Sequence, residues 1–336
     1  MKNKLIAFVM LFCCVINNSI KVYAWGVYGH QHIIKAAILA LPADMGMFFY
    51  DHCDFLVEES VVPDIRKYGL GDKSEFPRHY INLESYNYTS AKAMPQTMKD
   101  ALARFDKDSM QKHGILPWYM QDMTDKLTAA IRNKNKTEII FLAGDLSHYI
   151  ADAHMPLHTS INHDGQFTGQ KGIHAFWESQ LPEMFGDKYN YHTREAHYIN
   201  NITLTTWSIM ERSHMLADTM LLIEKTLRKE FPEDKVYTKD VEGEILKNKY
   251  GQPTFSREYA TEYHKRLHGM VEVQMKEAIQ MTADFWYTAW VNAGKPNMDD
   301  LDPHSLNDAN EKRYIEEKKE WQEGKLTGLK INKEFK

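Results

Sequence analysis

Residues 148–158 read His148-Tyr149-Ile150-Ala151-Asp152-Ala153-His154-Met155-Pro156-Leu157-His158, directly after an apolar run. The apolar residues of 139–146 recur at helical spacing and predict a buried helix. His148 and Asp152 are four residues apart, so both side chains project from one face of that helix. Pro156 should end or kink the helix, because it lacks an N–H and crowds the preceding turn. His158 then approaches from a new direction.

A second pair of the same kind follows in His174-Ala175-Phe176-Trp177-Glu178. A single His/acid pair at this spacing is usually an ion pair on a helix surface. Here two such pairs occur close in sequence to a third histidine, His158. Apolar residues flank both pairs, which is not expected of ion pairs on a helix surface. Imidazole and carboxylate together suit zinc, and ligands from two helices can build more than one site. The pattern therefore indicates a buried metal cluster.

Composition sets broad limits on the protein. The 336 residues suffice for one large domain or two smaller ones, and the 43% hydrophobic and 26% charged content is typical of a globular protein. The net charge is −5, and no basic block lies in the middle of the chain. This balance argues against tight electrostatic capture of duplex nucleic acid, although it does not exclude chemistry on it.

Residues 1–24 are predicted to be a signal peptide, with Lys2 and Lys4 before an apolar run and small residues near Ala24. The mature chain would begin at Trp25 and be exported, either to the periplasm or out of the cell. No later segment is long enough to cross a bilayer, so we expect no transmembrane anchor. Cys53 would be the only cysteine left, which excludes an internal disulfide. A monomer is expected.

The pattern along the chain predicts an all-α fold, in one multi-helix domain over 25–297. A charged tail over 298–336 is expected to be a solvated helix or disordered, because its charges alternate with few apolar residues. Extended or loop structure is expected at 76–82, around Pro77, and an exposed excursion at 231–254. Helices are expected to start near residues 30 and 137 and to cover 43–58, 118–133, 174–185, 202–230 and 256–291.

The order of the motifs resembles the trinuclear zinc phosphodiesterases. This superfamily comprises the zinc-dependent phospholipases C of bacteria and the single-strand-specific zinc nucleases. The resemblance covers roughly 25–295, and it rests on Trp25-Gly26…His30, Asp64-Ile65-Arg66, His79-Tyr80 and both His/acid pairs. It implies a helical domain with three zinc ions per chain in a cleft.

The resemblance also implies a ligand set for each ion. The first ion would be held by Asp64, His79, His148 and Asp152, and the second by His158, His174 and Glu178. The third would be held by His30, by Asp152 as a bridge, and by the free amino group and carbonyl of Trp25. Asp64 would orient or deprotonate the attacking water.

The sequence combines features of the two branches. The interval from Trp25 to His30 and the run His79-Tyr80-Ile81-Asn82 are nuclease-like. Glu178, the run from His148 to Asn162 and the short loop between His158 and His174 are closer to the phospholipases. The run departs from the phospholipase pattern at Ala151 and Ser160.

These features favour an exported hydrolase that uses zinc-activated water on a phosphodiester, with a phospholipid as substrate. One alternative is an endonuclease of the same fold for single-stranded RNA or DNA, which would need an aromatic stacking platform; Tyr80, Phe167 and Trp177 are the candidates. Another is a non-catalytic, zinc-stabilised binding protein, which predicts closed coordination shells.

Overall fold

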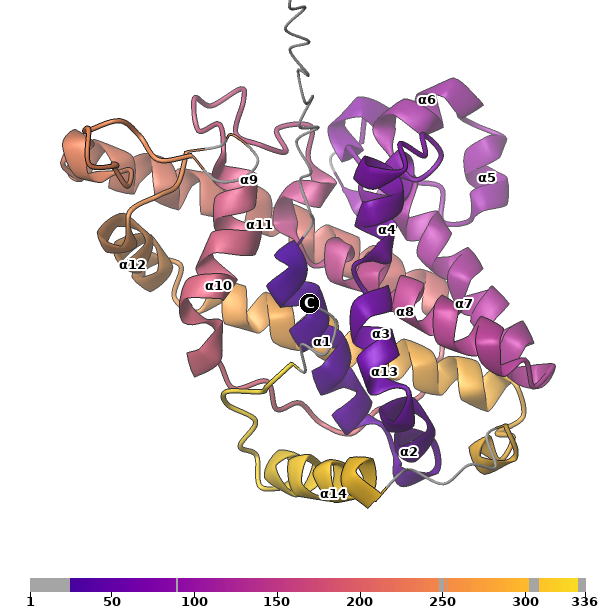
Figure 1. Ribbon diagram of the computed structural model, residues 1–336. Helices are drawn as coiled ribbons and strands as arrows, with labels where there is room; N and C mark the ends of the chain where they lie inside the picture. Colours follow the sequence, from indigo (N-terminus) through magenta and orange to yellow (C-terminus); the bar gives the residue numbers. More distant parts are fainter. Residues whose placement is uncertain (1–24, 89, 248–250, 252, 302–307, 332–336) are drawn as a thin grey trace, which may run out of the picture.

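The computed structural model describes residues 25–88, 90–247, 251, 253–301 and 308–331, so the predicted signal peptide lies outside the described residues. Within these ranges the regular secondary structure is helical (Figure 1), and the β contacts are isolated bridges such as Tyr237–Phe255. The prediction of an all-α fold is confirmed.

The α-helices are α1 (Gly26–Ala40), α2 (Ala43–Asp51), α3 (Cys53–Glu59), α4 (Val62–Asp64), α5 (Met98–Leu102), α6 (Lys107–His113), α7 (Leu116–Arg132), α8 (Lys136–Ala153), α9 (Ile173–Ala175), α10 (Leu181–Phe185), α11 (Ile202–Glu230), α12 (Arg257–Arg266), α13 (Met270–Asn292) and α14 (Asp308–Gln322). Two π-helical turns, η1 (Ile65–Gly69) and η6 (Phe176–Gln180), continue α4 and α9. The 3-10 turns are η2 (Phe76–His79), η3 (Leu83–Tyr86), η4 (Ala91–Ala93), η5 (Pro156–Thr159), η7 (Gly186–Lys188), η8 (Glu233–Lys235) and η9 (Met298–Asp300).

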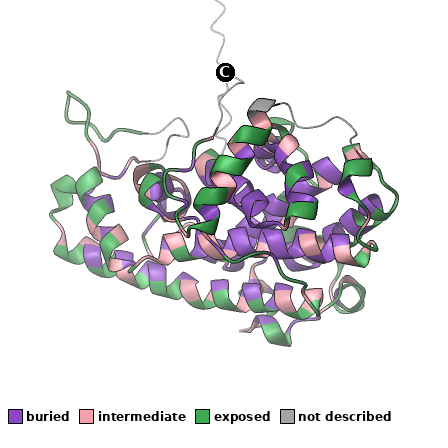
Figure 2. Ribbon diagram, turned by 90° about the horizontal axis from the view of Figure 1, so that it is seen from below, coloured by how far each residue is buried: buried purple, intermediate pink, exposed green. Residues whose placement is uncertain are grey.

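The core forms around α1 and α8, which pack on each other and on α3 and α13. Helix α7 covers α8 from the other side, and the long α11 crosses over α7 and η5 (Figure 1). Figure 2 shows buried residues concentrated in the central helices and exposed ones on the outer turns. Burial of these apolar faces supplies the main stabilisation of the fold.

Local sequence explains where α8 begins, how closely it packs and where it ends. The Asn135 side-chain oxygen accepts from the backbone N–H of Glu138, and the Asn135 side-chain amide donates to the Glu138 carboxylate, so Asn135 caps the start of α8. Gly144 allows α3 to approach, since a Cβ there would lie 2.5 Å from Glu59 Cγ. The helix ends at Ala153, and Pro156 opens the next turn.

Three expected boundaries are wrong. The helix expected over 256–291 is broken between α12 and α13, because His268 and Gly269 adopt left-handed backbone angles, φ 49° and 80°. Residues 76–79, expected to be extended or loop, form a 3-10 turn, since Pro77 is tolerated in the first turn of a helix. The helix expected over 43–58 is divided at His52 into α2 and α3.

The charged tail is also different from the expectation. Within 308–331, α14 packs on α1 and α2, and Tyr314, Trp321, Leu326 and Leu329 are buried. The ammonium of Lys35, on α1, lies 2.7 Å from the Glu317 carboxylate. The buried Lys35 on α1 thus pairs with Glu317 on α14. Residues 308–331 therefore pack on the helical domain.

Among the described residues, no helix is both long enough and apolar enough to cross a membrane.

Candidate metal centre

Eight of the nine predicted metal ligands bring their side chains together in three overlapping groups. The groups are His30, His148 and Asp152; Asp64, His79 and His148; and His158, His174 and Glu178. Within each group the candidate ligand atoms all lie within 4.8 Å of one another. We call Asp64, His79, His148 and Asp152 the deep group, and His158, His174 and Glu178 the rim group.

The rim group has the more regular geometry. The Nε2 atoms of His158 and His174 are 3.3 Å apart, and Glu178 Oε2 lies 3.7 Å from the first and 3.1 Å from the second. Two ligands of a tetrahedral zinc ion with bonds of 2.0–2.2 Å lie about 3.4 Å apart. The three atoms therefore already have the spacing that one zinc ion requires.

Asp152 links the two groups. Its Oδ2 lies 2.9 Å from His79 Nδ1 and 3.3 Å from His148 Nε2. Its Oδ1 lies 3.7 Å from both His30 Nε2 and His158 Nδ1, and it has no hydrogen-bond partner among the described residues. A fully buried carboxylate oxygen without a hydrogen bond costs free energy unless a cation contacts it. Asp152 is thus well placed to bridge two ions.

Contacts behind the imidazoles determine which ring nitrogen faces the cluster. The Nδ1 of His148 lies 2.8 Å from the carbonyl oxygen of Ser60, and the Nδ1 of His174 lies 2.7 Å from that of His163. Only a protonated nitrogen can donate to a carbonyl, so the Nε2 atoms keep their lone pairs for a metal. The approach of α3 to α8 at Gly144 positions Ser60 for this contact.

His79 has a carboxylate behind it in place of a carbonyl. Its Nε2 lies 3.5 Å from Glu75 Oε1, while its Nδ1 faces Asp152 and lies 3.7 Å from Asp64. Glu75 is fully buried and also accepts from Tyr149 and, at 3.2 and 2.9 Å, from Arg66 and Arg78. A carboxylate behind a ligand histidine fixes its tautomer and raises its basicity.

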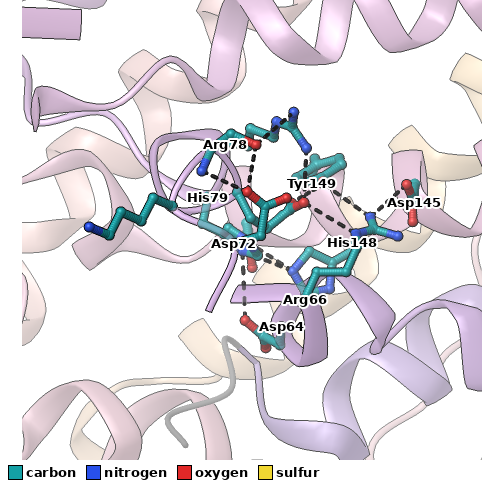
Figure 3. Close-up of polar contacts among 12 residues, drawn as sticks. Asp64, Arg66, Asp72, Arg78, His79, Asp145, His148 and Tyr149 are labelled. Carbon is teal, nitrogen blue, oxygen red and sulfur yellow. Dashed lines mark hydrogen bonds and ion pairs between the residues drawn. The ribbon is translucent and has the colours of Figure 1, made fainter. Parts of the chain in front are cut away.

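Figure 3 shows Arg66 beside the Asp145 carboxylate, which lies 2.7 Å from it, and His79 in contact with Asp64. Burial alone would raise the pKa of Glu75, but hydrogen bonds from His79 and Tyr149 hold it below its usual value. Glu75 is therefore ionised at neutral pH, and its charge is fixed directly behind the deep group.

Burial keeps most of the imidazoles of the site neutral, so that they can bind a cation. Burial lowers the pKa of His79 to about 4 and that of His148 to about 3, and it lowers the pKa of His158 far below its usual value. These rings are neutral at pH 7 and offer lone pairs. Burial would also lower the pKa of His174, but the Glu178 carboxylate raises it to about 9. A metal ion would replace that proton.

The buried carboxylates complement these neutral rings. Burial raises the pKa of both Asp152 and Glu178, and the neighbouring histidines His79 and His174 offset this desolvation only in part. Zinc supplies the missing charge and prefers nitrogen and oxygen donors of this kind. The residues present therefore fit the metal that the sequence predicted.

Trp25 lies between the two groups. Its indole N–H donates to the carbonyl oxygen of Ala151, and its ring packs against Trp177 with centroids 5.1 Å apart. Its backbone N–H acts on the Glu178 carboxylate and limits the rise in that group's pKa. These contacts hold the backbone nitrogen, which would be the terminal amine after cleavage, beside the cluster.

A cleft of about 430 Å³ opens onto the cluster and is lined by His79, His158 and His174. Its wall also carries aromatic and basic residues, namely Lys67, Tyr68, Phe76, Tyr80 and Lys112. Of the three aromatic residues proposed for stacking, Tyr80 lines this cleft, Phe167 is 68% exposed and Trp177 is fully buried. Trp177 is therefore unavailable to a substrate.

Three groups of the site were not predicted from the sequence, namely Glu75, Lys67 and the carbonyl of Ser60. Glu75 was detectable, because it stands four residues before His79 and so repeats the spacing of the two His/acid pairs. The Ser60 carbonyl carries no sequence signal, since any residue offers one. Lys67 looked like one of many surface lysines, and only the cleft distinguishes it.

Comparison with known proteins gives two findings. A family model described as zinc dependent phospholipase C matches residues 29–223. A protein named as a probable serine protease, from Bradyrhizobium tropiciagri, is 34% identical over 83 residues, or 25% of this chain and 10% of that protein. The chain thus spans about a tenth of the length of that curated relative.

Proposed function

The chain belongs to the zinc-dependent phospholipase C family, whose model matches more than half of it, and from this premise we propose that it is an exported hydrolase cleaving a phosphodiester in phospholipids. The observation that carries the proposal is the rim group, with ligand atoms 3.1–3.7 Å apart beside an open cleft. Three metal-sized groups lie next to one another, and Asp152 contacts histidines of all three, which favours a cluster over one structural site.

We assign three zinc ions to these residues. The deep group would hold one, the rim group a second, and His30, Asp152 and the amino group and carbonyl of Trp25 a third. Zinc bound here would activate a water, neutralise the phosphate and stabilise the departing oxygen. An exported chain cleaved before Trp25 would supply the terminal amine.

The reaction requires a base and a path for one proton. Asp64, fully buried beside His79, is our candidate for taking the proton of the attacking water. The water oxygen bonds to phosphorus while the phosphorus–oxygen bond on the glycerol side breaks, and the proton ends on the glycerol oxygen. The products are a diacylglycerol and a phosphorylated head group.

A nuclease is the second candidate, because Tyr80, Tyr68 and Phe76 give the cleft aromatic faces on which bases can stack. A non-catalytic binding protein fits less well. Structural zinc sites are closed by four protein ligands, whereas three of the histidines here line an open cleft.

The test uses one preparation of the mature protein, assayed side by side against short-chain phospholipids and single-stranded RNA, with and without a zinc chelator. We expect zinc-dependent release of phosphorylated head group and no RNA cleavage. RNA cleavage without phospholipid turnover would favour the nuclease, and no turnover of either would favour a binding protein. Sequencing the N-terminus of exported protein tests cleavage before Trp25.

A further inference from the structure

A buried lysine lies in the wall of the cleft. Lys67 is on η1, three residues after Asp64, and is only 8% exposed. Its ammonium lies 4.6 Å from the ring centroid of Tyr68 and 5.6 Å from that of Phe76. Both rings line the same cleft as the metal cluster, so the lysine fills part of the aromatic wall that a substrate would meet.

Aromatic walls of this kind are how proteins bind quaternary ammonium groups such as choline. In this protein a cation of its own already occupies that position. A second cation brought against Tyr68 and Phe76 would lie close to the Lys67 ammonium, and two like charges repel strongly in a partly buried cleft. The wall therefore works against a cationic head group.

The other charges of the cleft support this reading. Lys112, a second basic residue, also lines the cleft. The lining has one carboxylate, Asp164, and its Oδ1 accepts from the backbone N–H groups of Gly172 and His174 at 2.9 and 3.3 Å. Lys67 itself stays charged at neutral pH: burial opposes its charge, but Tyr68 and Asp64 raise its pKa.

We propose that the cleft selects those acidic phospholipids whose head groups carry no amine, such as phosphatidylglycerol, over choline lipids, and that Lys67 is the residue that makes the distinction. Its ammonium would donate to hydroxyl or phosphate oxygens of the head group while repelling a quaternary ammonium. The inference rests on the proposed phospholipase activity and narrows its substrate class.

The test measures kcat/KM of the zinc-loaded protein for dihexanoyl phosphatidylglycerol and dihexanoyl phosphatidylcholine, both kept below their micelle concentrations. Monomeric lipids remove the charge of a vesicle surface, so the ratio reports on the cleft alone. We expect a preference for phosphatidylglycerol of about tenfold or more, the size of one hydrogen bond to a charged group. A faster reaction with phosphatidylcholine would overturn the inference and leave the proposed function intact.

Two variants locate the preference. Lys67→Gln should bring the two values of kcat/KM together, mainly through KM, and Lys67→Arg should preserve the preference because it keeps the charge. Lys126→Gln is the matched control, since Lys126 also lies beside a tyrosine, 5.9 Å from the Tyr119 ring, but is 52% exposed and does not line the cleft. An unchanged ratio in Lys67→Gln, at unchanged zinc content, would contradict the assignment.

A binding measurement is independent of turnover. Tetramethylammonium should not inhibit the wild-type protein, whereas Lys67→Leu should gain competitive inhibition because Tyr68 and Phe76 become free. Inhibition of the wild type would contradict the inference even if Lys67→Leu does not fold. Absence of turnover with either lipid, together with RNA cleavage, would overturn both this inference and the proposed function.

Discussion

The deep and rim groups of the metal centre differ in what lies behind their imidazoles. In the deep group, His79 is backed by Glu75, and Arg66, Arg78 and Tyr149 hold that carboxylate. In the rim group, His174 is backed by the carbonyl of His163, which lies in an exposed loop. One group depends on a buried ionic network and the other on a single loop contact.

This difference suggests different tasks. A buried network holds its ligands in place before the metal arrives, because every member is fixed by several partners. A loop with few buried contacts opens more readily and exchanges its ligand more easily. The deep group is therefore suited to retain zinc, and the rim group to adjust as substrate enters. Four predictions test this difference between the deep group and the rim group.

The largest effect is expected at Asp152, which contacts both groups. Asp152→Asn should lower turnover about a hundred- to a thousandfold, since an amide bridges two cations poorly and metal catalysis contributes several kcal/mol. Glu178→Gln, which affects the rim group alone, should cost less. Turnover and zinc content are measured on both. Equal residual turnover with unchanged zinc content would contradict the bridging role.

The second prediction concerns Trp25, which lies between the groups. An amide nitrogen has its lone pair delocalised into the carbonyl and is a far weaker ligand than a free amine. A chain that keeps one extra residue before Trp25 should therefore bind one zinc ion fewer, and its turnover should fall about ten- to a hundredfold if the lost ligand resembles other metal-site defects. Matching zinc content and rate in both chains would show that the amine is not a ligand.

The third prediction separates the deep group from the rim group. Glu75→Gln leaves the volume unchanged but removes the charge behind His79, so zinc affinity of the deep group should fall about 10- to 100-fold. Chelator competition measures the affinity, and thermal unfolding of the metal-free protein reports separately on stability. Glu258→Gln is the control, because Glu258 is 72% exposed. A change in stability without a change in affinity would make Glu75 purely structural.

The smallest effect is expected at the rim loop. Asp164→Ala removes the acceptor for the N–H groups of Gly172 and His174, so the loop that positions His174 should loosen. Zinc affinity of the rim group should fall by about tenfold, the low end for outer contacts of a metal site, with the deep group unaffected. Loss of zinc from both groups together would show that the two groups do not act separately.

Most of the candidate metal centre could be predicted from the sequence, because the proposed ligands come in short local patterns. The spacing of His148 with Asp152, and of His174 with Glu178, fixes each pair on one helix face whatever the rest of the chain does. The helical pattern of 202–230 matches α11 residue for residue for the same reason. Boundaries at His52 and at Gly269 were missed, because a local break in a long apolar pattern depends on neighbouring helices.

The charged tail shows most clearly which part of the fold could not be predicted from the sequence. Its alternating charges are those of a solvated segment, yet within 308–331 it packs on α1 and α2. The Lys318 ammonium donates to the carbonyls of Leu39 and Leu41 at the end of α1, at 2.7 and 2.8 Å. A charged side chain can pack against the domain when its partner lies on another helix. The charge pattern of the sequence does not show where that partner is.

The helical class and the pairing of histidines with carboxylates in the candidate metal centre could be predicted from the sequence, because helix periodicity is local. Only the tertiary structure decided which imidazole nitrogen faces the cluster, since that depends on the Ser60 and His163 carbonyls and on Glu75. It likewise decided that Lys67 lies in the cleft. These are contacts between segments distant in the chain, and they exist only once the helices have packed.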